Sequence, residues 1–254
     1  MACQAVIRRP LTPWMRYADG MTRATAHEPR IARVAAMMAD PARSLMLAYL
    51  LSGELASAGE LASAASVTAA TASGHLSKLL DVGLLICEAR GRHRYYKLAN
   101  QDVAHALEAL AVVAERSSHD HLWEHPARKR LRFARCCYGH LAGELGVKLL
   151  ATLQDREGLK VTPKGYELTP SGVAWMADLG LHPKLPVSGR RFAYPCLDWS
   201  ERRDHLAGQL ADELLEHFIQ RAWIRRADGR ALDLTPRGVQ SLLPMLNAPA
   251  ANTG

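Results

Sequence analysis

The sequence lacks any long run of apolar residues, and its 254 residues include only five cysteines. A membrane-spanning helix needs about 20 consecutive apolar residues, and no segment approaches that length. An odd number of cysteines in a chain of this size does not indicate a disulfide framework. Arginines and prolines near the N-terminus stand where a signal peptide would need an apolar core. These features predict a cytoplasmic protein with no membrane partner.

The sequence also lacks a glycine-rich phosphate loop, a dinucleotide-binding fingerprint and a pair of catalytic carboxylates. Its hydrophobic content of 48% and charged content of 22% are ordinary for a globular protein, and its length suits two domains. The net charge is +7, but residues 1–120 hold thirteen basic residues against eleven acidic ones. A prediction that this half binds nucleic acid therefore depends on where its basic residues stand, and not on the net charge of the chain.

Residues 57–98 carry the strongest pattern in the sequence. A short helix with apolar residues on one face is followed by a second helix, which Thr68 can cap with its hydroxyl. Leu76, Leu79 and Leu80 form the buried stripe of that second helix. A glycine and a hairpin follow, and this order is typical of a helix-turn-helix with a wing.

The outward face of the second helix carries short polar side chains and one cation. Side chains of this size reach base edges and phosphates in a DNA major groove. The predicted DNA contacts on this helix are Thr68, Thr71, Ser73, His75 and Lys78.

The tip of the predicted hairpin is basic. Arg90, Arg92 and Arg94 lie within five residues, and such a cluster suits phosphates or a minor groove. Gly91 permits the positive φ that a hairpin tip often needs. Because the charge follows a helix-turn-helix in the right order, we interpret it as a DNA contact. The alternative is a solvated hairpin with no binding role.

This region resembles the ArsR-type family of winged-helix repressors over about residues 29–114. The motifs that carry the resemblance are Ala39-Asp40-Pro41-Ala42-Arg43, Ser73-Gly74-His75-Leu76, Val82-Gly83-Leu84-Leu85, and the wing Arg90-Gly91-Arg92 with Tyr95-Tyr96-Lys97-Leu98. The resemblance implies a homodimeric bacterial repressor that a ligand, often a metal or metalloid, releases from double-stranded operator DNA.

The chain departs from the metal sites of that family. The first helix of the motif lacks the two cysteines of a familiar arsenic-sensing pattern. Asp102, His105, Glu115 and His119 have the residue types of another pattern but not quite its spacing. The helix that carries some of these residues has a continuous apolar stripe, which predicts a dimer seam. The stripe consists of Val103, Ala106, Leu107, Leu110 and Val113.

The C-terminal half repeats itself with a period of about 65 residues. His140-Leu-Ala-Gly143-Glu-Leu145 returns as His205-Leu-Ala-Gly208-Gln-Leu210, and Leu168-Thr-Pro-Ser-Gly172 returns as Leu234-Thr-Pro-Arg-Gly238. Each unit is predicted to contain an amphipathic helix, a strand pair and a helix that starts at Thr-Pro. The residues predicted for the two amphipathic helices are Leu141, Leu145, Leu149 and Leu206, Leu210, Leu214, Phe218.

This order is the skeleton of a degenerate winged helix. The predicted fold class is therefore mainly α with small β wings (α+β). The predicted domains are an N-terminal arm (1–27), a winged helix-turn-helix domain for DNA binding and dimerisation (28–118), and a C-terminal domain (119–254). The C-terminal domain is divided into repeats at about 133–182 and 192–247.

Cysteines stand just before each repeated helix motif. If pseudo-symmetry brings the repeats together, five possible sensor residues gather: Cys136, Cys137, His140, Cys196 and His205. Such soft donors suit arsenite, mercury or zinc. A thiol near a helix N-terminus and next to Arg135 can also be reactive through a lowered pKa. The third interpretation is simple packing, with Cys137 and Cys196 as small hydrophobes at equivalent positions.

The predicted function is a homodimeric transcriptional repressor that binds operator DNA. A ligand, a thiol modification or a metal(loid) sensed in the C-terminal half would release it. No cofactor is certain at this point. Two alternatives stay open: a thiol-dependent enzyme that uses Cys137 with His140 as its base, and a DNA-binding or interaction protein with no ligand response.

Overall fold

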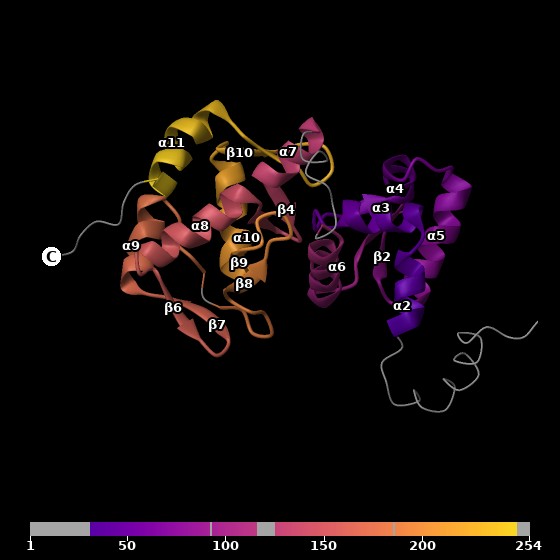
Figure 1. The fold of residues 1–254 in the computed structure, drawn as a ribbon, viewed down its shortest axis with the longest axis horizontal. Helices are drawn as coiled ribbons and strands as arrows, with labels where there is room; N and C mark the ends of the chain where they lie inside the picture. The colour runs from indigo at the N-terminus through magenta and orange to yellow at the C-terminus, as the bar shows by residue number, and fades with distance from the viewer. Residues whose placement is uncertain (1–30, 92, 116–124, 185, 248–254) are drawn as a thin grey trace, which may run out of the picture.

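A computed structural model describes residues 31–91, 93–115, 125–184 and 186–247. The predicted N-terminal arm lies outside the described residues. Figure 1 shows a winged-helix half and a half built from two repeats, with helix α6 between them. No helix in the described part of the chain is long and apolar enough to cross a membrane.

The first half has the element order of a winged helix-turn-helix, as predicted. Its sheet has the strand order β1-β3-β2, so that the short first strand pairs with the second strand of the wing. The elements are α2 (Ile31–Met38), α3 (Pro41–Leu50), β1 (Ala56–Ser57), α4 (Ala58–Ala64), α5 (Ala69–Asp81), β2 (Leu85–Arg90), β3 (His93–Leu98) and α6 (Gln101–Ala114).

The starts of these helices follow from their capping residues. Asp40 accepts a hydrogen bond from the backbone N–H of Arg43 at 3.0 Å, and proline occupies the first turn of α3. Ser57 and Glu60 form a reciprocal capping box at the start of α4. Thr68 caps α5, as predicted, by accepting from the backbone N–H of Thr71 at 3.2 Å.

A buried arginine joins α2 to α3. Arg43 Nε donates to the carbonyl of Met37 at 2.6 Å, and Nη2 donates to that of Ala36 at 3.0 Å. These carbonyls lie in the last turn of α2, where no helical partner remains for them. The side chain of Arg43 therefore supplies hydrogen bonds to the last carbonyls of α2, while its backbone belongs to the first turn of α3.

The second half has the same element order twice: hairpin, helix, hairpin, helix. A connecting helix, α7 (Pro126–Phe133), precedes it. The first repeat contains β4 (Arg135–Cys137), β5 (His140–Ala142), α8 (Glu144–Asp155), β6 (Leu159–Thr162), β7 (Gly165–Leu168) and α9 (Pro170–Asp178). The second contains β8 (Tyr194–Leu197), β9 (Asp204–Ala207), α10 (Gln209–Gln220), β10 (Ile224–Arg226), β11 (Leu232–Leu234) and α11 (Pro236–Asn247).

The hairpin ahead of each first helix corrects the sequence prediction. Leu141 and Leu206 were expected on α8 and α10, but they lie in strands β5 and β9. Gly143 and Gly208 separate strand from helix with φ values of 84° and 99°, which only glycine adopts readily. The helices therefore begin one residue after these glycines.

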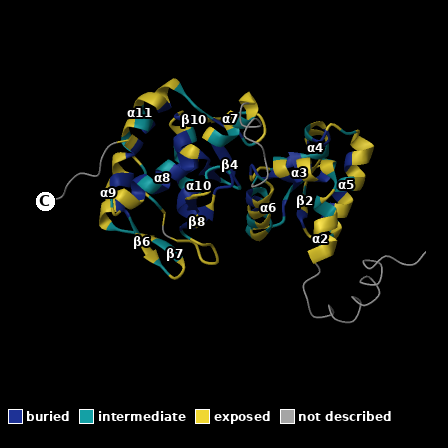
Figure 2. Ribbon diagram, viewed as in Figure 1, coloured by how far each residue is buried: buried dark blue, intermediate teal, exposed yellow. Residues whose placement is uncertain are grey.

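Each half has its own cluster of buried apolar side chains, as the dark blue interior of Figure 2 shows. The N-terminal cluster includes Leu61, Leu76 and Leu79 of the helix-turn-helix. The C-terminal cluster combines α8 and α10 of the two repeats, including Leu149 and Leu214. The repeats therefore share one core, since neither amphipathic helix could bury its apolar face alone.

The repeated Thr-Pro-x-Gly motif has a packing reason. In the second repeat, Thr235 accepts a hydrogen bond from the backbone N–H of Gly238 at 3.0 Å and donates its hydroxyl to the carbonyl of Ala222 at 2.7 Å. A Cβ atom on Gly238 would lie 2.1 Å from the carbonyl oxygen of Trp223. Close approach of α11 to the preceding turn therefore requires glycine at this position.

We predict that Gly238→Ala destabilises the protein by about 1–3 kcal/mol, the usual cost of overpacking. The control is Gly74→Ala in helix α5, where an added Cβ meets nothing within 4 Å. That change should be neutral or stabilise by up to about 1 kcal/mol, because alanine favours helix. Urea unfolding of both variants measures the difference. Equal midpoints for the two variants would contradict the close packing of α11.

Candidate DNA interface and buried thiol-imidazole cluster

Helix α5 presents an exposed polar face at the edge of the molecule (Figure 2). Thr68, Thr71, Ser73 and Lys78 are all exposed on it. The hydroxyls of Thr68 and Thr71 lie 2.9 Å apart and hydrogen-bond to each other at the helix start. The short side chains leave the helix backbone accessible, and such a surface fits a major groove.

His75 differs from these residues in its exposure. Its side chain is 15% exposed, and Nδ1 lies 3.3 Å from Arg43 Nη1 and 3.8 Å from a carboxylate oxygen of Asp40. The ring therefore contacts the start of α3 instead of projecting outward. The partly buried ring links α5 to α3, and its expected contact with DNA stays a prediction.

The wing presents basic side chains at its tip. Arg90 is 63% exposed, and its guanidinium lies 3.4 Å from Glu88 and 5.9 Å from the centre of the Tyr95 ring. Arg94 is exposed on the opposite strand. Gly91 has φ 60°, which confirms the expected positive φ at the turn. Arg92, the third predicted contact, lies outside the described residues.

Four of the five predicted sensor residues meet in the interior of the C-terminal half. Donor atoms of Cys137, His140, Cys196 and His205 all lie within 4.8 Å of one another, and all four residues are buried. Cys137 is paired with His140 across the hairpin β4-β5, and Cys196 with His205 across β8-β9. Each repeat therefore contributes one cysteine and one histidine to this thiol-imidazole cluster.

Cys136 does not join the cluster. Adjacent residues of a strand face opposite sides, so its side chain points away from that of Cys137. The Cys136 thiol instead lies 3.0 Å from the carbonyl oxygen of Ser52, at the end of α3. The predicted five-residue set is thus reduced to four.

The thiols are not in the electrostatic setting that a reactive cysteine needs. Burial raises the pKa of Cys136 to about 11. The neighbouring thiol of Cys196, together with burial, raises the pKa of Cys137 to about 12. These residues stand in strands and not at a helix N-terminus. For Cys136 and Cys137, the expectation of a lowered thiol pKa was therefore wrong.

The two histidines face each other through Nε2, and the Nε2 atoms are 3.2 Å apart. Their other ring nitrogens lie near carboxylates: His205 Nδ1 is 3.0 Å from Asp198, and His140 Nδ1 is 3.8 Å from Asp212. Burial disfavours a charged ring at His205, but the contacts with Asp198 and Cys137 outweigh it and raise the pKa of His205 to about 9.

Asp198 connects the cluster to helix α6. It is fully buried and lies 2.8 Å from Arg135 Nη2, which in turn lies 3.9 Å from Glu108 of α6. Arg230 pairs with the other oxygen of Glu108. Burial disfavours the carboxylate of Glu108, but these two arginines hold its pKa below its usual value. Sequence reasoning missed this network, although a glutamate inside an apolar helix pattern was a usable signal.

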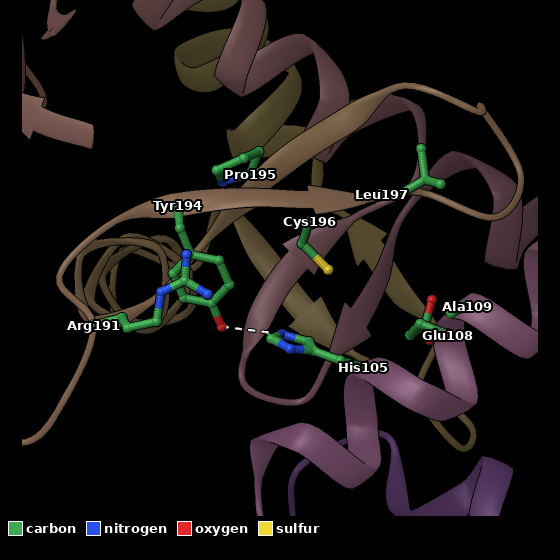
Figure 3. A pocket seen from close by; sticks show the side chains of 8 residues that line it. All are labelled: His105, Glu108, Ala109, Arg191, Tyr194, Pro195, Cys196 and Leu197. Atoms are coloured by element: carbon green, nitrogen blue, oxygen red, sulfur yellow. Dashed lines mark hydrogen bonds between the residues drawn. The ribbon is translucent and has the colours of Figure 1, made fainter. Parts of the chain in front are cut away.

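A cavity of about 180 Å³ opens where α6 meets strand β8 (Figure 3). Tyr194 projects from β8 towards α6, and its hydroxyl lies 3.1 Å from His105 Nε2. Cys196 projects from the same face of β8 and also lines this cavity. One edge of the thiol-imidazole cluster is therefore next to a cavity between the two halves.

A capped recognition helix followed by a basic wing defines a winged helix-turn-helix DNA-binding protein. A family model described as a helix-turn-helix domain matches residues 38–88. The HTH-type transcriptional regulator YdfF of Bacillus subtilis is 41% identical over 212 residues, which are 83% of this chain and 94% of that protein. The chain belongs to the ArsR-type winged helix-turn-helix transcriptional regulators.

Other matches cover the N-terminal half. The HTH-type transcriptional regulator CmtR of Mycobacterium bovis is 36% identical over 86 residues, or 34% of this chain and 72% of that protein. The solution structure of the cadmium sensor CmtR from Mycobacterium tuberculosis is 35% identical, with a TM-score of 0.30, and covers 35% of this chain and 92% of that one. Only the match to YdfF, among these, extends through the repeats.

Loss of the buried carboxylate should be costly. Glu108→Ala leaves the buried Arg135 and the partly buried Arg230 each short of a partner, and we expect a destabilisation of about 3–5 kcal/mol. Asp102→Ala removes an exposed carboxylate from the same helix and should change stability by less than about 0.5 kcal/mol. Chemical denaturation of both variants checks this. A Glu108→Ala protein as stable as the Asp102→Ala protein would show that the network contributes little.

Proposed function

We propose that the protein is a homodimeric repressor that binds double-stranded operator DNA. The observation that carries this proposal is the exposed polar face of α5 beside an exposed basic wing. Thr68, Thr71, Ser73 and Lys78 would contact the major groove, and the wing arginines Arg90, Arg92 and Arg94 the backbone or minor groove. His75 would position α5.

A regulator is better supported than a thiol enzyme. A nucleophilic cysteine needs a low pKa and access to substrate, whereas Cys137 is buried and has a pKa raised to about 12. The named relatives are transcriptional regulators. The same burial argues against direct modification of Cys137 as the inducing signal.

The C-terminal half is proposed to sense the inducer. It contacts the DNA-binding half at two places close to the thiol-imidazole cluster. The backbone N–H of Tyr138 donates to the carbonyl of Leu51 at 2.7 Å, and Tyr194 contacts His105 of α6. A ligand that binds differently to two arrangements of this contact would shift the protein between DNA-binding and non-binding states.

We predict that Arg90→Ala/Arg94→Ala weakens binding to a duplex that the wild type selects from a random double-stranded pool. Because two phosphate contacts are lost, the slope of the logarithm of the association constant against the logarithm of the salt concentration should be shallower by roughly 2. Arg225→Ala is the control, because Arg225 is 69% exposed on the hairpin of the second repeat. Fluorescence anisotropy across a salt series measures both quantities. Unchanged affinity and slope in the double variant, or no sequence selected by the wild type, would overturn the proposal.

Helix α6 supports the proposed dimer. Ala104, Glu108 and Val112 are buried, with Ala104 in the N-terminal core and Glu108 against the repeats, while Leu110 and Val113 remain 48% and 60% exposed. These exposed residues belong to the stripe predicted as a dimer seam. A second copy of the chain would remove them from water.

We therefore expect Leu110→Asp/Val113→Asp to convert the dimer to a monomer, because two charges would be buried at the seam. Val161→Asp is the control, since Val161 is 76% exposed on the hairpin β6-β7. Analytical ultracentrifugation of the three proteins decides the matter. A monomeric wild type, or a double variant that stays dimeric, would exclude this face as the seam.

A further inference from the structure

We propose that Cys137, His140, Cys196 and His205 bind one zinc-class divalent metal ion in tetrahedral coordination. The site lies in the repeated half and uses none of the residues that the family resemblance associates with metals. Metal binding by these four residues does not depend on the proposed DNA-binding function.

The distances fit such an ion. Zinc bonds to histidine nitrogen at about 2.0 Å and to cysteine sulfur at about 2.3 Å, so tetrahedral ligand atoms lie roughly 3.3–3.8 Å apart. The two Nε2 atoms are 3.2 Å apart, and all four donor atoms lie within 4.8 Å. Modest side-chain rotation would bring every donor into bonding distance.

The ring orientations also fit. Metal-bound histidines usually hold a carboxylate at their other ring nitrogen, which fixes the tautomer and turns the free lone pair to the metal. Asp198 and Asp212 stand at the Nδ1 atoms of His205 and His140. With each Nδ1 beside a carboxylate, the two Nε2 atoms are left facing one point in the interior, where a metal ion can bind both.

The charge balance selects the metal class. Binding of a divalent ion displaces the protons of two thiols and the proton that a charged His205 carries on Nε2; all three leave to solvent, and the two thiolates cancel the 2+ charge. The imidazoles bind as neutral ligands, so the buried complex carries no net charge and avoids the large cost of an unpaired ion. Two sulfur and two nitrogen donors in a tetrahedral arrangement are typical of zinc, and cobalt and cadmium can replace it.

His140 and Asp212 supply a separate indication. His140 Nδ1 and Asp212 Oδ1 are both buried and lack a hydrogen-bond partner among the described residues, yet they lie only 3.8 Å apart. A small shift of the imidazole upon metal binding would join them. The cavity beside Cys196 provides the path by which an ion reaches the cluster.

The test uses the full-length protein purified without added metal, then treated with a chelator and dialysed. Mass spectrometry of metals measures zinc before and after titration, and cobalt titration reports geometry through its absorption spectrum. We expect one zinc per chain, and a cobalt complex with intense tetrahedral bands and a sulfur charge-transfer band in the near ultraviolet.

Cys196→Ser and His205→Asn should each abolish the one-to-one complex. Cys136→Ser is the matched control, because Cys136 neighbours a proposed ligand in the same strand but faces Ser52. It should keep one zinc per chain. Asp212→Asn should weaken metal affinity about 10–100-fold without changing the stoichiometry, as expected for a residue that positions a ligand.

Measurements on the wild type keep the proposal falsifiable if a variant fails to fold. Absence of stoichiometric metal or an octahedral cobalt spectrum would overturn it, as would equal loss of metal in Cys136→Ser. A Cys137–Cys196 disulfide in place of bound metal under reducing purification would do so too. DNA binding is measured separately, so its failure with intact metal binding would remove the proposed function and leave the metal site.

Discussion

The burial of the Asp198 carboxylate is the constraint on which the C-terminal half depends. With no exposure to water, this group must be neutralised by protein, and it has Arg135, His205 and the backbone N–H of Gly143 as partners. Those contacts and charges hold the pKa of Asp198 well below its usual range, although burial opposes this. Arg135 is buried by the same pairing and therefore needs Glu108 of α6 as a second partner. The protein groups that neutralise this one carboxylate thus fix both the position of the cluster and the contact between the two halves.

Most of the fold could be predicted because short sequence motifs mark where its helices and turns begin. Thr68 at a helix start, glycine at the wing turn and the repeated Thr-Pro-x-Gly motif are each determined by neighbouring backbone, so the sequence shows them directly. The hairpins ahead of α8 and α10 were missed because Leu141 and Leu145 have helical spacing. The repeated glycine of His-Leu-Ala-Gly marked the break, but its positive φ is a property of the folded backbone.

The candidate sites were harder to predict because burial depends on tertiary contacts. His75 shares a helical face with Thr71 and Lys78 in a simple projection, yet its ring nitrogen contacts Arg43 of α3. Cys136 and Cys137 are adjacent residues of the same type, so the sequence does not distinguish them. The alternation of side chains along a strand decides which of the two faces the histidines. The predicted arm (1–27) and Arg92 lie outside the described residues, so the predictions for them remain predictions.

The repeat explains why the cluster has four donors. Differences between the two repeats explain where the cluster lies relative to the DNA-binding half. Each hairpin places a cysteine directly opposite a histidine, so one repeat supplies half of a tetrahedral set. The turn of the first hairpin is short, and Tyr138 within it contacts the end of α3. The second hairpin has a longer connection, which carries Asp198 and so reaches α6 through Arg135. An ion that pulls the two hairpins together would act on both contacts at once, because the elements that hold it are the elements that touch the DNA-binding half.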